Sequence, residues 1–338
     1  GASITAIPNV LKMSGFNNVF LVKEQAEPNG NFPTIKSPNP EEPEAFKIAI
    51  KQAKKNDGEI IIGTDADGDC LGVSIKDENQ NFYLLNGNQI MVVIIHFLLE
   101  HWKKRGKLNG NQFIATTIVS TPMIKKIASE YNVAYKETLT GFKWISKLIE
   151  DFPDLEFIAG GEESHGYLIG EKVRDKDAIS AALLICEIEN QMRKIGKSTY
   201  ELLLECYKKF GAHKERLISF VKKGKEGINQ IDRKMNSFRK SPPKFIDGIP
   251  IVQIKDYEKG FSFNLSNKIK TKINLPKSNV LTFILEDNSK ISIRPSGTEP
   301  KIKFYFSVTQ PFINDRKWNE TEKEMDEKID KLIQDLIK

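Results

Sequence analysis

Three aspartates, Asp65, Asp67 and Asp69, stand at alternate positions in GTDADGDCLG, directly after the apolar run 60–62. Carboxylates held this close repel one another unless a cation lies between them. Hard oxygen ligands suit Mg²⁺ or Ca²⁺. An EF-hand is disfavoured, because an apolar strand precedes the loop and Lys76 stands where an EF-hand needs glutamate. We therefore expect an Mg²⁺ site that serves a phosphate; an ordinary polar turn is the alternative.

A second polar group follows a later apolar strand, in GGEESHGYLIGEKVRDKD. Glu162 and Ser164 stand two residues apart in a glycine-rich loop, and a carboxylate with a hydroxyl is a suitable pair for sugar hydroxyls. Lys176, in the charged run RDKD, would carry a proton if its pKa were lowered. For His165 a functional and a structural role both stay open, and a solvated loop is the alternative for the whole stretch.

A third group lies in RPSGTEPKIKFY, between two short alternating strands. Arg294 offers a forked cation, Ser296 and Thr298 offer hydroxyls, and Gly297 exposes its backbone N–H. Lys303 adds charge on the following strand. This set of donors predicts a phosphate site. The alternative is a tight β-hairpin with SGT at its turn.

Composition limits the class of protein. Hydrophobic residues make up 39% and charged residues 28% of 338 residues, as in globular proteins of two or three domains. No apolar run reaches the roughly 18 residues of a membrane span, and no signal peptide is recognised. Three cysteines in no zinc or redox spacing predict a reducing, cytoplasmic setting. The stretch 211–255 has eleven Lys/Arg against four Asp/Glu, but without interleaved aromatics it favours a solvated surface over nucleic-acid binding.

The elements that must position these groups alternate along the chain. The chain begins with apolar residues at helical spacing up to Gly15, and a short buried strand is expected at 18–22. A proline-rich loop and a helix at 44–56 follow. The apolar run before the aspartate loop is typical of a parallel strand covered on both faces. From 87 to about 196, helices and strands alternate as in βαβ units. After Gly211 the strands are shorter and alternating, flanked by helices at 225–238 and 321–337, which indicates an antiparallel sheet.

The three loops, in this order, resemble those of the alpha-D-phosphohexomutase superfamily, the phosphoglucomutase/phosphomannomutase group. TDADGDCLGV resembles its metal-binding loop, GGEESHGY its sugar-binding loop and RPSGTEP its phosphate-binding loop. TLTGFKWI and VRDKDA resemble further family segments. The resemblance covers essentially the whole chain and implies the second, third and fourth domains of a four-domain enzyme. We therefore expect two tandem α/β domains, 1–87 and 88–210, and a smaller α+β domain with an antiparallel sheet, 211–338.

The resemblance also implies roles for individual residues. Mg²⁺ would be held by Asp65, Asp67 and Asp69. Lys176 matches a proposed proton carrier, and His165 and Lys143 are weaker catalytic candidates. The sugar phosphate would be bound by Thr140, Gly141, Glu162, Ser164, Arg174, Arg294, Ser296, Gly297, Thr298 and Lys303.

The implied activity is phosphoryl transfer between the 1- and 6-positions of a hexose phosphate, through a hexose 1,6-bisphosphate and a phosphoserine. Nothing in this chain resembles the family's phosphoserine motif, so that domain is an expected missing partner and the chain alone is expected to be inactive. Family metal loops carry an arginine where this chain has Cys70. The alternative is therefore a catalytically silent phosphosugar-binding protein. The sequence leaves the sugar and the oligomeric state undetermined.

Overall fold

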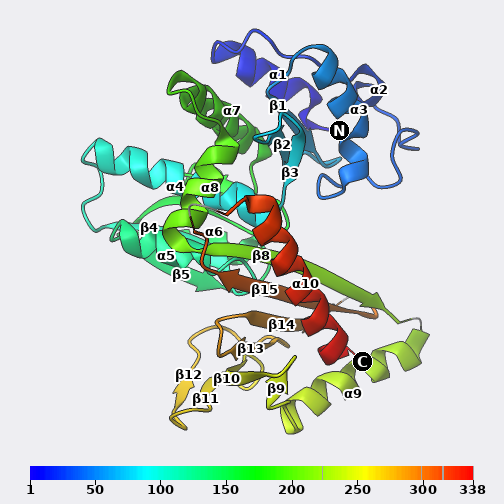
Figure 1. Ribbon diagram of the computed structural model, residues 1–338, viewed down its shortest axis with the longest axis vertical. Coiled ribbons are helices and arrows are strands. Elements are labelled where there is room, and N and C mark those ends of the chain that lie inside the picture. Colours follow the sequence, from blue (N-terminus) through cyan, green and yellow to red (C-terminus); the bar gives the residue numbers. More distant parts are fainter. Residues whose placement is uncertain (223, 298, 314–315, 338) are drawn as a thin grey trace. The chain divides into compact units, whose positions relative to one another are not determined.

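The computed structural model describes residues 1–222, 224–297, 299–313 and 316–337 (Figure 1). The chain divides into two compact units, Gly1–Phe210 and Gly211–Lys338. Each unit has its own sheets and its own core. The division of the first unit near residue 87, expected from the sequence, stays a prediction.

The first part of unit 1 is a small antiparallel sheet with three preceding helices. The helices are α1 (Ser3–Met13), α2 (Lys23–Ala26) and α3 (Pro43–Lys55). The strands are β1 (Ile60–Thr64), β2 (Leu71–Lys76) and β3 (Phe82–Leu85), in the order β1-β2-β3. The aspartate loop connects β1 to β2, so the β-hairpin holds both of its ends.

Two expectations for this region are wrong. Residues 18–22 do not form a strand, and Phe20 exposes 59% of its surface. β1 pairs antiparallel with β2, not with a parallel neighbour, and lies at the edge of its sheet among the described residues. An apolar run with β-propensity forms a buried parallel strand only where neighbouring strands complete the ladder.

The second sheet of unit 1 confirms the expected βαβ alternation. Its order is β5-β4-β6-β7, where β4 (Gln112–Thr117) pairs parallel with β5 (Ala134–Thr138) and β6 (Glu156–Gly161), and β7 (Tyr167–Ile169) is antiparallel. The helices are α4 (Gly87–Lys104), α5 (Met123–Glu130) and α6 (Lys143–Asp151). The apolar helix α4 is buried along most of its length and starts at a capping box between Asn86 and Gln89.

Two further helices, α7 (Ala178–Lys194) and α8 (Thr199–Phe210), complete unit 1. α7 begins at Asp177, whose Oδ1 accepts hydrogen bonds from the backbone N–H groups of Ile179 and Ser180, both at 3.0 Å. This N-cap fixes the end of the RDKD run. α7 packs against α1, β1 and β7, so it contacts elements of both sheets of unit 1.

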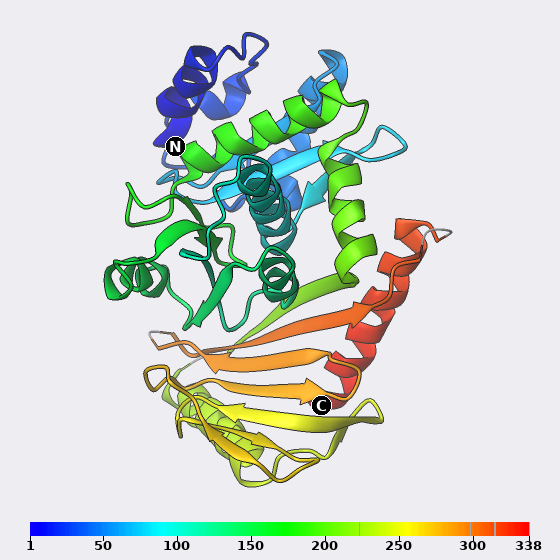
Figure 2. The same ribbon diagram turned by 90° about the vertical axis from the view of Figure 1, so that its left-hand side faces the viewer.

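Among its described residues, unit 2 has one eight-stranded sheet, and its antiparallel arrangement is the one that the sequence predicts. Its main order is β12-β11-β10-β13-β14-β15-β8, with β9 paired to β10 (Figure 2). The strands are β8 (Ala212–Val221), β9 (Phe245–Ile246), β10 (Ile249–Asp256), β11 (Phe261–Asn264), β12 (Lys270–Lys272), β13 (Leu281–Leu285), β14 (Lys290–Pro295) and β15 (Lys301–Gln310). The long pair β15 and β8 fixes the register at one end of this path.

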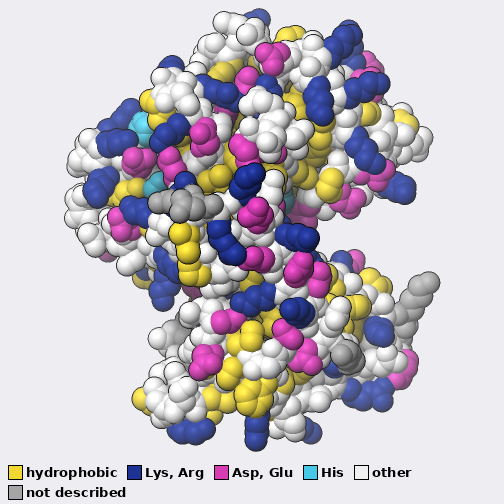
Figure 3. Space-filling view, viewed as in Figure 1, with side chains coloured by type: hydrophobic (Ala, Val, Ile, Leu, Met, Phe, Trp, Pro, Cys, Tyr) yellow, Lys and Arg dark blue, Asp and Glu magenta, His cyan; other side chains and the backbone are white. Residues whose placement is uncertain are grey.

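The helices of unit 2 are α9 (Gly224–Lys240) and α10 (Trp318–Ile337). α10 packs against β15 and β8 through the apolar stripe that the sequence shows, with Met325, Ile329 and Leu332 fully buried. None of the described helices combines the length and the apolar composition needed to cross a bilayer. On the face drawn in Figure 3, Lys/Arg and Asp/Glu side chains are interspersed and form no surface of a single sign.

Candidate active site

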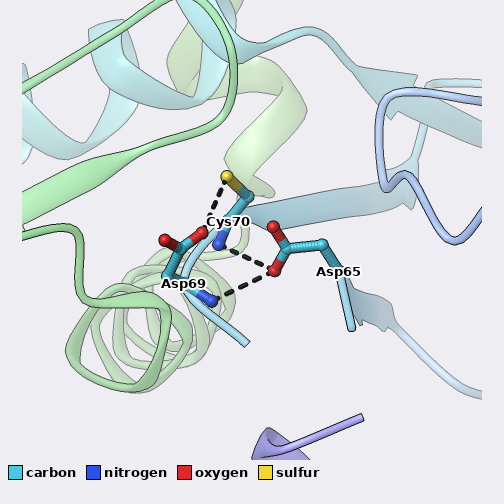
Figure 4. A group of neighbouring side chains, drawn as sticks. All are labelled: Asp65, Asp69 and Cys70. Carbon is cyan, nitrogen blue, oxygen red and sulfur yellow. Dashed lines mark hydrogen bonds between the residues drawn. The ribbon is translucent and has the colours of Figure 1, made fainter. Parts of the chain in front are cut away.

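The aspartate loop is organised around the carboxylate of Asp65 (Figure 4). Its Oδ1 accepts three backbone hydrogen bonds, from Gly68 at 3.1 Å and from Asp69 and Cys70 at 3.0 Å each. Gly68 has φ +77°, a conformation that favours glycine. The loop is therefore closed by its own first carboxylate, which brings the side chains of Asp69 and Cys70 to the same side as Asp65.

Asp65, Asp69 and Cys70 form the cluster in this loop. One ligand atom from each lies within 4.8 Å of the others. Asp67, expected as a third ligand, is exposed and lies outside this cluster. The Cys70 thiol donates a hydrogen bond to Asp69 Oδ1 at 3.1 Å. Sequence reasoning set Cys70 aside as a ligand; its position beside two carboxylates follows from the tight turn at Gly68.

Lys176 places a positive charge directly beside this cluster. Its Nζ lies 2.7 Å from the Asp69 carboxylate and 3.4 Å from Cys70 Sγ. Burial opposes the charged form of Asp69, but the hydrogen bond from Lys176 lowers the pKa of that carboxyl below its usual value. Burial raises the pKa of Asp65, and the nearby carboxylates act in the same direction.

The lysine itself stays charged. Burial opposes the ammonium form, but the hydrogen bond to Asp69 raises the pKa of Lys176 above its ordinary value. The lowered pKa that the sequence argument required of a proton-carrying lysine is therefore not found. In this arrangement Lys176 is the cationic partner of Asp69.

The predicted sugar-binding loop lies between β6 and β7. Glu162 is buried, and its Oε1 accepts a hydrogen bond from the backbone N–H of Gly141 at 2.7 Å. Gly141 has φ +113°, which only glycine adopts readily. The loop before α6, with the half-buried Thr140, is thus fastened to Glu162, whereas Ser164 is exposed to solvent. The structure therefore brings Thr140 and Gly141 to the Glu162 loop.

The metal loop and the sugar loop are joined by main-chain and side-chain bonds. The backbone N–H of Leu71 donates to His165 O at 2.9 Å, and His165 Nδ1 lies 3.0 Å from Leu71 O. Cys70 and Gly166 form an antiparallel bridge next to this pair. His165 is 3% exposed and has φ +64°. Burial lowers the pKa of His165 to about 4, so it is neutral at physiological pH and donates Nδ1–H to the carbonyl.

Close packing at two glycines strengthens this junction. A Cβ on Gly166 would lie 2.5 Å from Cδ of Lys176, so Gly166 lets the lysine chain pass over the loop. A Cβ on Gly87 would lie 2.1 Å from the carbonyl oxygen of Glu163. Sequence reasoning did not single out Glu163, whose Oε2 accepts hydrogen bonds from Thr117 at 3.0 Å and Ser120 at 3.3 Å. In the sequence, only the position of Glu163 next to Glu162 in GEES could have pointed to this role.

Two other predicted residues lie nearby on the surface of unit 1. Lys143, at the start of α6, is exposed, and its Nζ lies 5.4 Å from the centre of the Trp144 ring. The Arg174 side chain is exposed, while its carbonyl accepts a hydrogen bond from Ser146 Oγ at 2.5 Å. That bond ties the segment before Lys176 to α6.

The predicted phosphate-binding loop connects β14 to β15 in unit 2. Arg294 and Lys303 are direct cross-strand partners. Like charges in this position repel and destabilise the sheet unless an anion lies between them. The loop is tightened by bonds from Ser296 N–H to Lys301 O at 2.7 Å and from Glu299 N–H to Ser296 Oγ at 3.3 Å. Gly297 is exposed, and Thr298 lies outside the described residues.

The donor set of the aspartate cluster suits a divalent cation in part. The carboxylates of Asp65 and Asp69 are hard ligands of the kind that Mg²⁺ prefers, and both lie in a loop whose backbone is fixed. The thiol of Cys70 is a soft ligand and a poor match for Mg²⁺. The two carboxylates therefore fit the ion, with water as the natural source of further oxygen ligands.

Known proteins resemble the chain in sequence and in fold. The family model for phosphoglucomutase/phosphomannomutase alpha/beta/alpha domain II matches residues 1–79, and that for domain III matches residues 86–210. A phosphoglucomutase of Staphylococcus haemolyticus is 37% identical over 309 residues, which are 91% of this chain and 56% of that protein. The chain thus spans about half the length of the curated relatives it matches.

Two solved structures share the fold at low sequence identity. A phosphoglucomutase/phosphomannomutase family protein from Burkholderia thailandensis matches with a TM-score of 0.58 and 17% identity, over 92% of this chain and 54% of that one. A putative phosphomannomutase from Thermus thermophilus matches with a TM-score of 0.55 and 17% identity, over 88% and 51%. With two adjacent domain models matching more than half of the residues, the chain belongs to the phosphoglucomutase/phosphomannomutase family.

Proposed function

We propose that this chain carries the metal-, sugar- and phosphate-binding parts of a phosphohexomutase, which moves a phosphoryl group between the 1- and 6-positions of a hexose phosphate. The observation that carries the proposal is the junction of the metal loop and the sugar loop, through the reciprocal bonds of Leu71 and His165. An enzyme that transfers a phosphoryl group to a sugar hydroxyl needs its metal and its sugar in one fixed relation.

In this proposal Asp65 and Asp69 hold Mg²⁺, and Asp67, which lies outside their cluster in the structure, would have to turn toward the ion to become the third ligand. When bound, the ion neutralises charge on the phosphoryl group that is transferred. Lys176 contributes a second positive charge beside the loop, 2.7 Å from Asp69. We assign it to stabilising phosphoryl oxygens while it stays protonated, because its raised pKa makes it a poor base.

Glu162 is the proposed anchor for the sugar. Its carboxylate is buried, and its position is held by the hydrogen bond from Gly141. Carboxylate oxygens and the exposed hydroxyl of Ser164 are suited to accept and donate bonds to vicinal hydroxyls. Thr140 and Lys143 stand on the segment that is bonded to this loop through Gly141, and Arg174 stands on a segment bonded to α6; all three would complete the substrate contacts. His165 acts by holding the two loops together, since both its ring and its carbonyl are engaged with Leu71.

In unit 2, Arg294 and Lys303 would bind the phosphate that is not transferred, together with Ser296, Gly297 and Thr298. Two cations in direct cross-strand register support an anionic ligand. The phosphoryl donor is proposed to be a phosphoserine outside residues 1–338, with hexose 1,6-bisphosphate as the intermediate. The cytoplasm is the proposed location, where sugar phosphates are available.

A silent phosphosugar-binding protein is the second candidate, and one observation favours it. Asp69 is already paired with Lys176 and accepts the Cys70 thiol, so the metal loop is partly satisfied without an ion. The two candidates differ in metal binding. A mutase needs a divalent ion at this loop, whereas a silent binder does not.

Calorimetric titration of the 338-residue chain with glucose 6-phosphate, glucose and inorganic phosphate tests the proposal. Glucose 6-phosphate should bind more tightly than glucose, and Arg294→Ala should reduce that difference by at least about tenfold. Lys272→Ala, on the edge strand β12, is the matched control and should behave like the unaltered chain. Equal loss of sugar and sugar-phosphate binding in Arg294→Ala would remove Arg294 from the phosphate role. No binding of any of these ligands would contradict the proposed function.

A further inference from the structure

Glu163 connects the predicted sugar-binding loop to the carboxyl end of β4. Its Oε2 accepts hydrogen bonds from the hydroxyls of Thr117 at 3.0 Å and of Ser120 at 3.3 Å. Thr117 is the last residue of β4, and Ser120 lies in the turn before α5. Both are almost fully buried, at 1% and 2% exposed, whereas Glu163 is half-buried. The glutamate side chain thus reaches from the loop to two buried donors.

The turn that carries these donors is itself held in place. The backbone N–H of Ser120 donates to Thr117 O at 3.1 Å, and the two hydroxyl oxygens lie 2.9 Å apart. The N–H of the next residue, Thr121, donates to Oδ1 of the buried Asn88 at 2.9 Å, and Asn88 stands in the first turn of α4. Both donors therefore have fixed positions, and an acceptor bonded to them is fixed as well.

The contact lies where the order of strands in the second sheet of unit 1 reverses. β4 leads through α5 to β5 on one side, and β6 lies on its other side and leads to β7. In open α/β sheets, ligands bind outside the carboxyl ends of the strands at such a point. β4 and β6 are paired up to Thr116 and Gly161, so Thr117 and the residues after Gly161 emerge at the same edge of the sheet.

Three separate parts of the fold hold the sugar-binding loop. The segment before α6 is bonded to Glu162, the end of β4 to Glu163, and the strand after the metal loop to His165. Ser164, between the second and the third of these, is exposed. Because Glu163 stands between the two proposed sugar contacts in the chain, its bonds determine how those two side chains are placed relative to each other.

We propose that Glu163 is a positioning residue of the sugar site. Its bonds to the end of β4 hold Glu162 and Ser164 at the spacing that two hydroxyls of a sugar require, and it acts through these neighbours. A loop that is ordered before the ligand arrives does not lose conformational entropy on binding, so its contacts contribute more to affinity. The inference rests on the proposed function, which assigns Glu162 and Ser164 to the sugar.

The test compares glucose 6-phosphate binding by calorimetry in paired variants of the 338-residue chain. Thr117→Val removes one donor at nearly the same side-chain volume, and Thr117→Ser keeps it. Glu163→Ala removes the acceptor, and Glu163→Gln keeps an acceptor oxygen of the same reach. Glu156→Ala is the matched control, because Glu156 stands at the opposite end of β6 and accepts a bond at 3.1 Å from Gln112, a buried residue of β4.

Glu163→Ala and Thr117→Val should each weaken glucose 6-phosphate binding by about tenfold. Glu163→Gln, Thr117→Ser and Glu156→Ala should stay within about threefold of the unaltered chain. The affinity for inorganic phosphate, which the proposed function assigns to unit 2, should be the same in all of them. Amide hydrogen exchange in 161–166 should be faster only in the two weak binders. Adding Thr117→Val to Glu163→Ala should cause no further loss, because both changes remove the same bond.

Full glucose 6-phosphate affinity in Glu163→Ala would overturn the inference, as would equal affinities in Thr117→Val and Thr117→Ser. Loss in both Glu163 variants with full affinity in Thr117→Val would make Glu163 a direct sugar ligand and would also overturn it. An equal loss in Glu156→Ala would do the same, because the effect would then be general destabilisation. Failure of the proposed function is distinguishable, since the unaltered chain itself would then bind glucose 6-phosphate no more tightly than glucose, and the role of Glu163 toward the sugar would be lost with it.

Discussion

Replacing Lys176 with methionine should make the aspartate loop bind divalent cations more tightly. The ammonium of Lys176 lies 2.7 Å from the carboxylate of Asp69, which is also a proposed metal ligand. A cation bound to that carboxylate would therefore lie close to a fixed positive charge. Methionine keeps most of the length and apolar packing of the lysine chain over Gly166, and it removes the charge together with the hydrogen bonds to Asp69 and Cys70.

The magnitude follows from the geometry. With a metal–oxygen distance of about 2.1 Å, the ion and the ammonium are at most about 5 Å apart. At this separation a divalent ion and a unit charge repel by about 2 kcal/mol at the dielectric constant of water. The side chains of Lys176 and Asp69 are 25% and 30% exposed, so solvent and salt screen part of this repulsion. A net gain of about 1–2 kcal/mol corresponds to an affinity increase of about fivefold to thirtyfold.

The assay is a titration of the chain with Mn²⁺, followed by electron paramagnetic resonance of the free ion and by competition with Mg²⁺. Lys172→Met is the matched control, because Lys172 is an exposed lysine in the same loop. Asp69→Asn should abolish binding in both backgrounds. Unchanged or weaker binding in Lys176→Met would refute the reasoning, since it would show that the lysine supports the ligand arrangement and does not compete with the ion.

Three further outcomes are expected. Glu162→Gln should weaken glucose 6-phosphate binding and speed amide hydrogen exchange around Gly141, because a neutral amide accepts a weaker hydrogen bond than a carboxylate. Unchanged exchange around Gly141 would argue against Glu162 as the group that holds this loop. The pKa of His165 is about 4 in the folded chain and near 6.5 in the unfolded chain, so the unfolded chain binds more protons between these two pH values. The free energy of unfolding should therefore fall as the pH drops through this window, by up to about 3 kcal/mol. His165→Asn should flatten that dependence in urea titrations at pH 7.5 and 5.0, and an unaltered slope would contradict the assignment. Burial raises the pKa of the Cys70 thiol, so iodoacetamide at pH 8 should alkylate Cys70 much more slowly in the folded chain than in urea, as peptide mass spectrometry would show.

The sequence predicted the parts of the site that are local in the chain. Alternating carboxylates after an apolar strand predicted a turn with three convergent carboxylates, and the closed loop around Asp65 brings two of them, Asp65 and Asp69, together. The alternation of apolar runs with helical stretches predicted the parallel sheet of β4, β5 and β6. These features depend on periodicity and turn chemistry, which neighbouring residues determine.

The sequence could not predict the contacts that join distant segments. Leu71 and His165 are 94 residues apart, and Lys176 and Asp69 are 107 residues apart, yet both pairs are bonded. Asp67 has the same spacing as its neighbours but is exposed, and of the three aspartates only Asp65 and Asp69 belong to the cluster. Such contacts depend on how helices and sheets pack, so they cannot be predicted from the spacing of residue types along the chain.

Residue type, spacing and hydrophobic periodicity thus determined the family resemblance, the loops and most of the elements. Only the tertiary structure decided that Lys176 is the charged partner of Asp69, that His165 holds two loops together, and that β1 pairs antiparallel with β2. The physical reason is that a pKa or a strand pairing depends on burial and on neighbours in space. The composition of the apolar run 60–62 predicts a buried strand, but which strand it pairs with, and in which direction, depends on the strands that lie beside it in the fold.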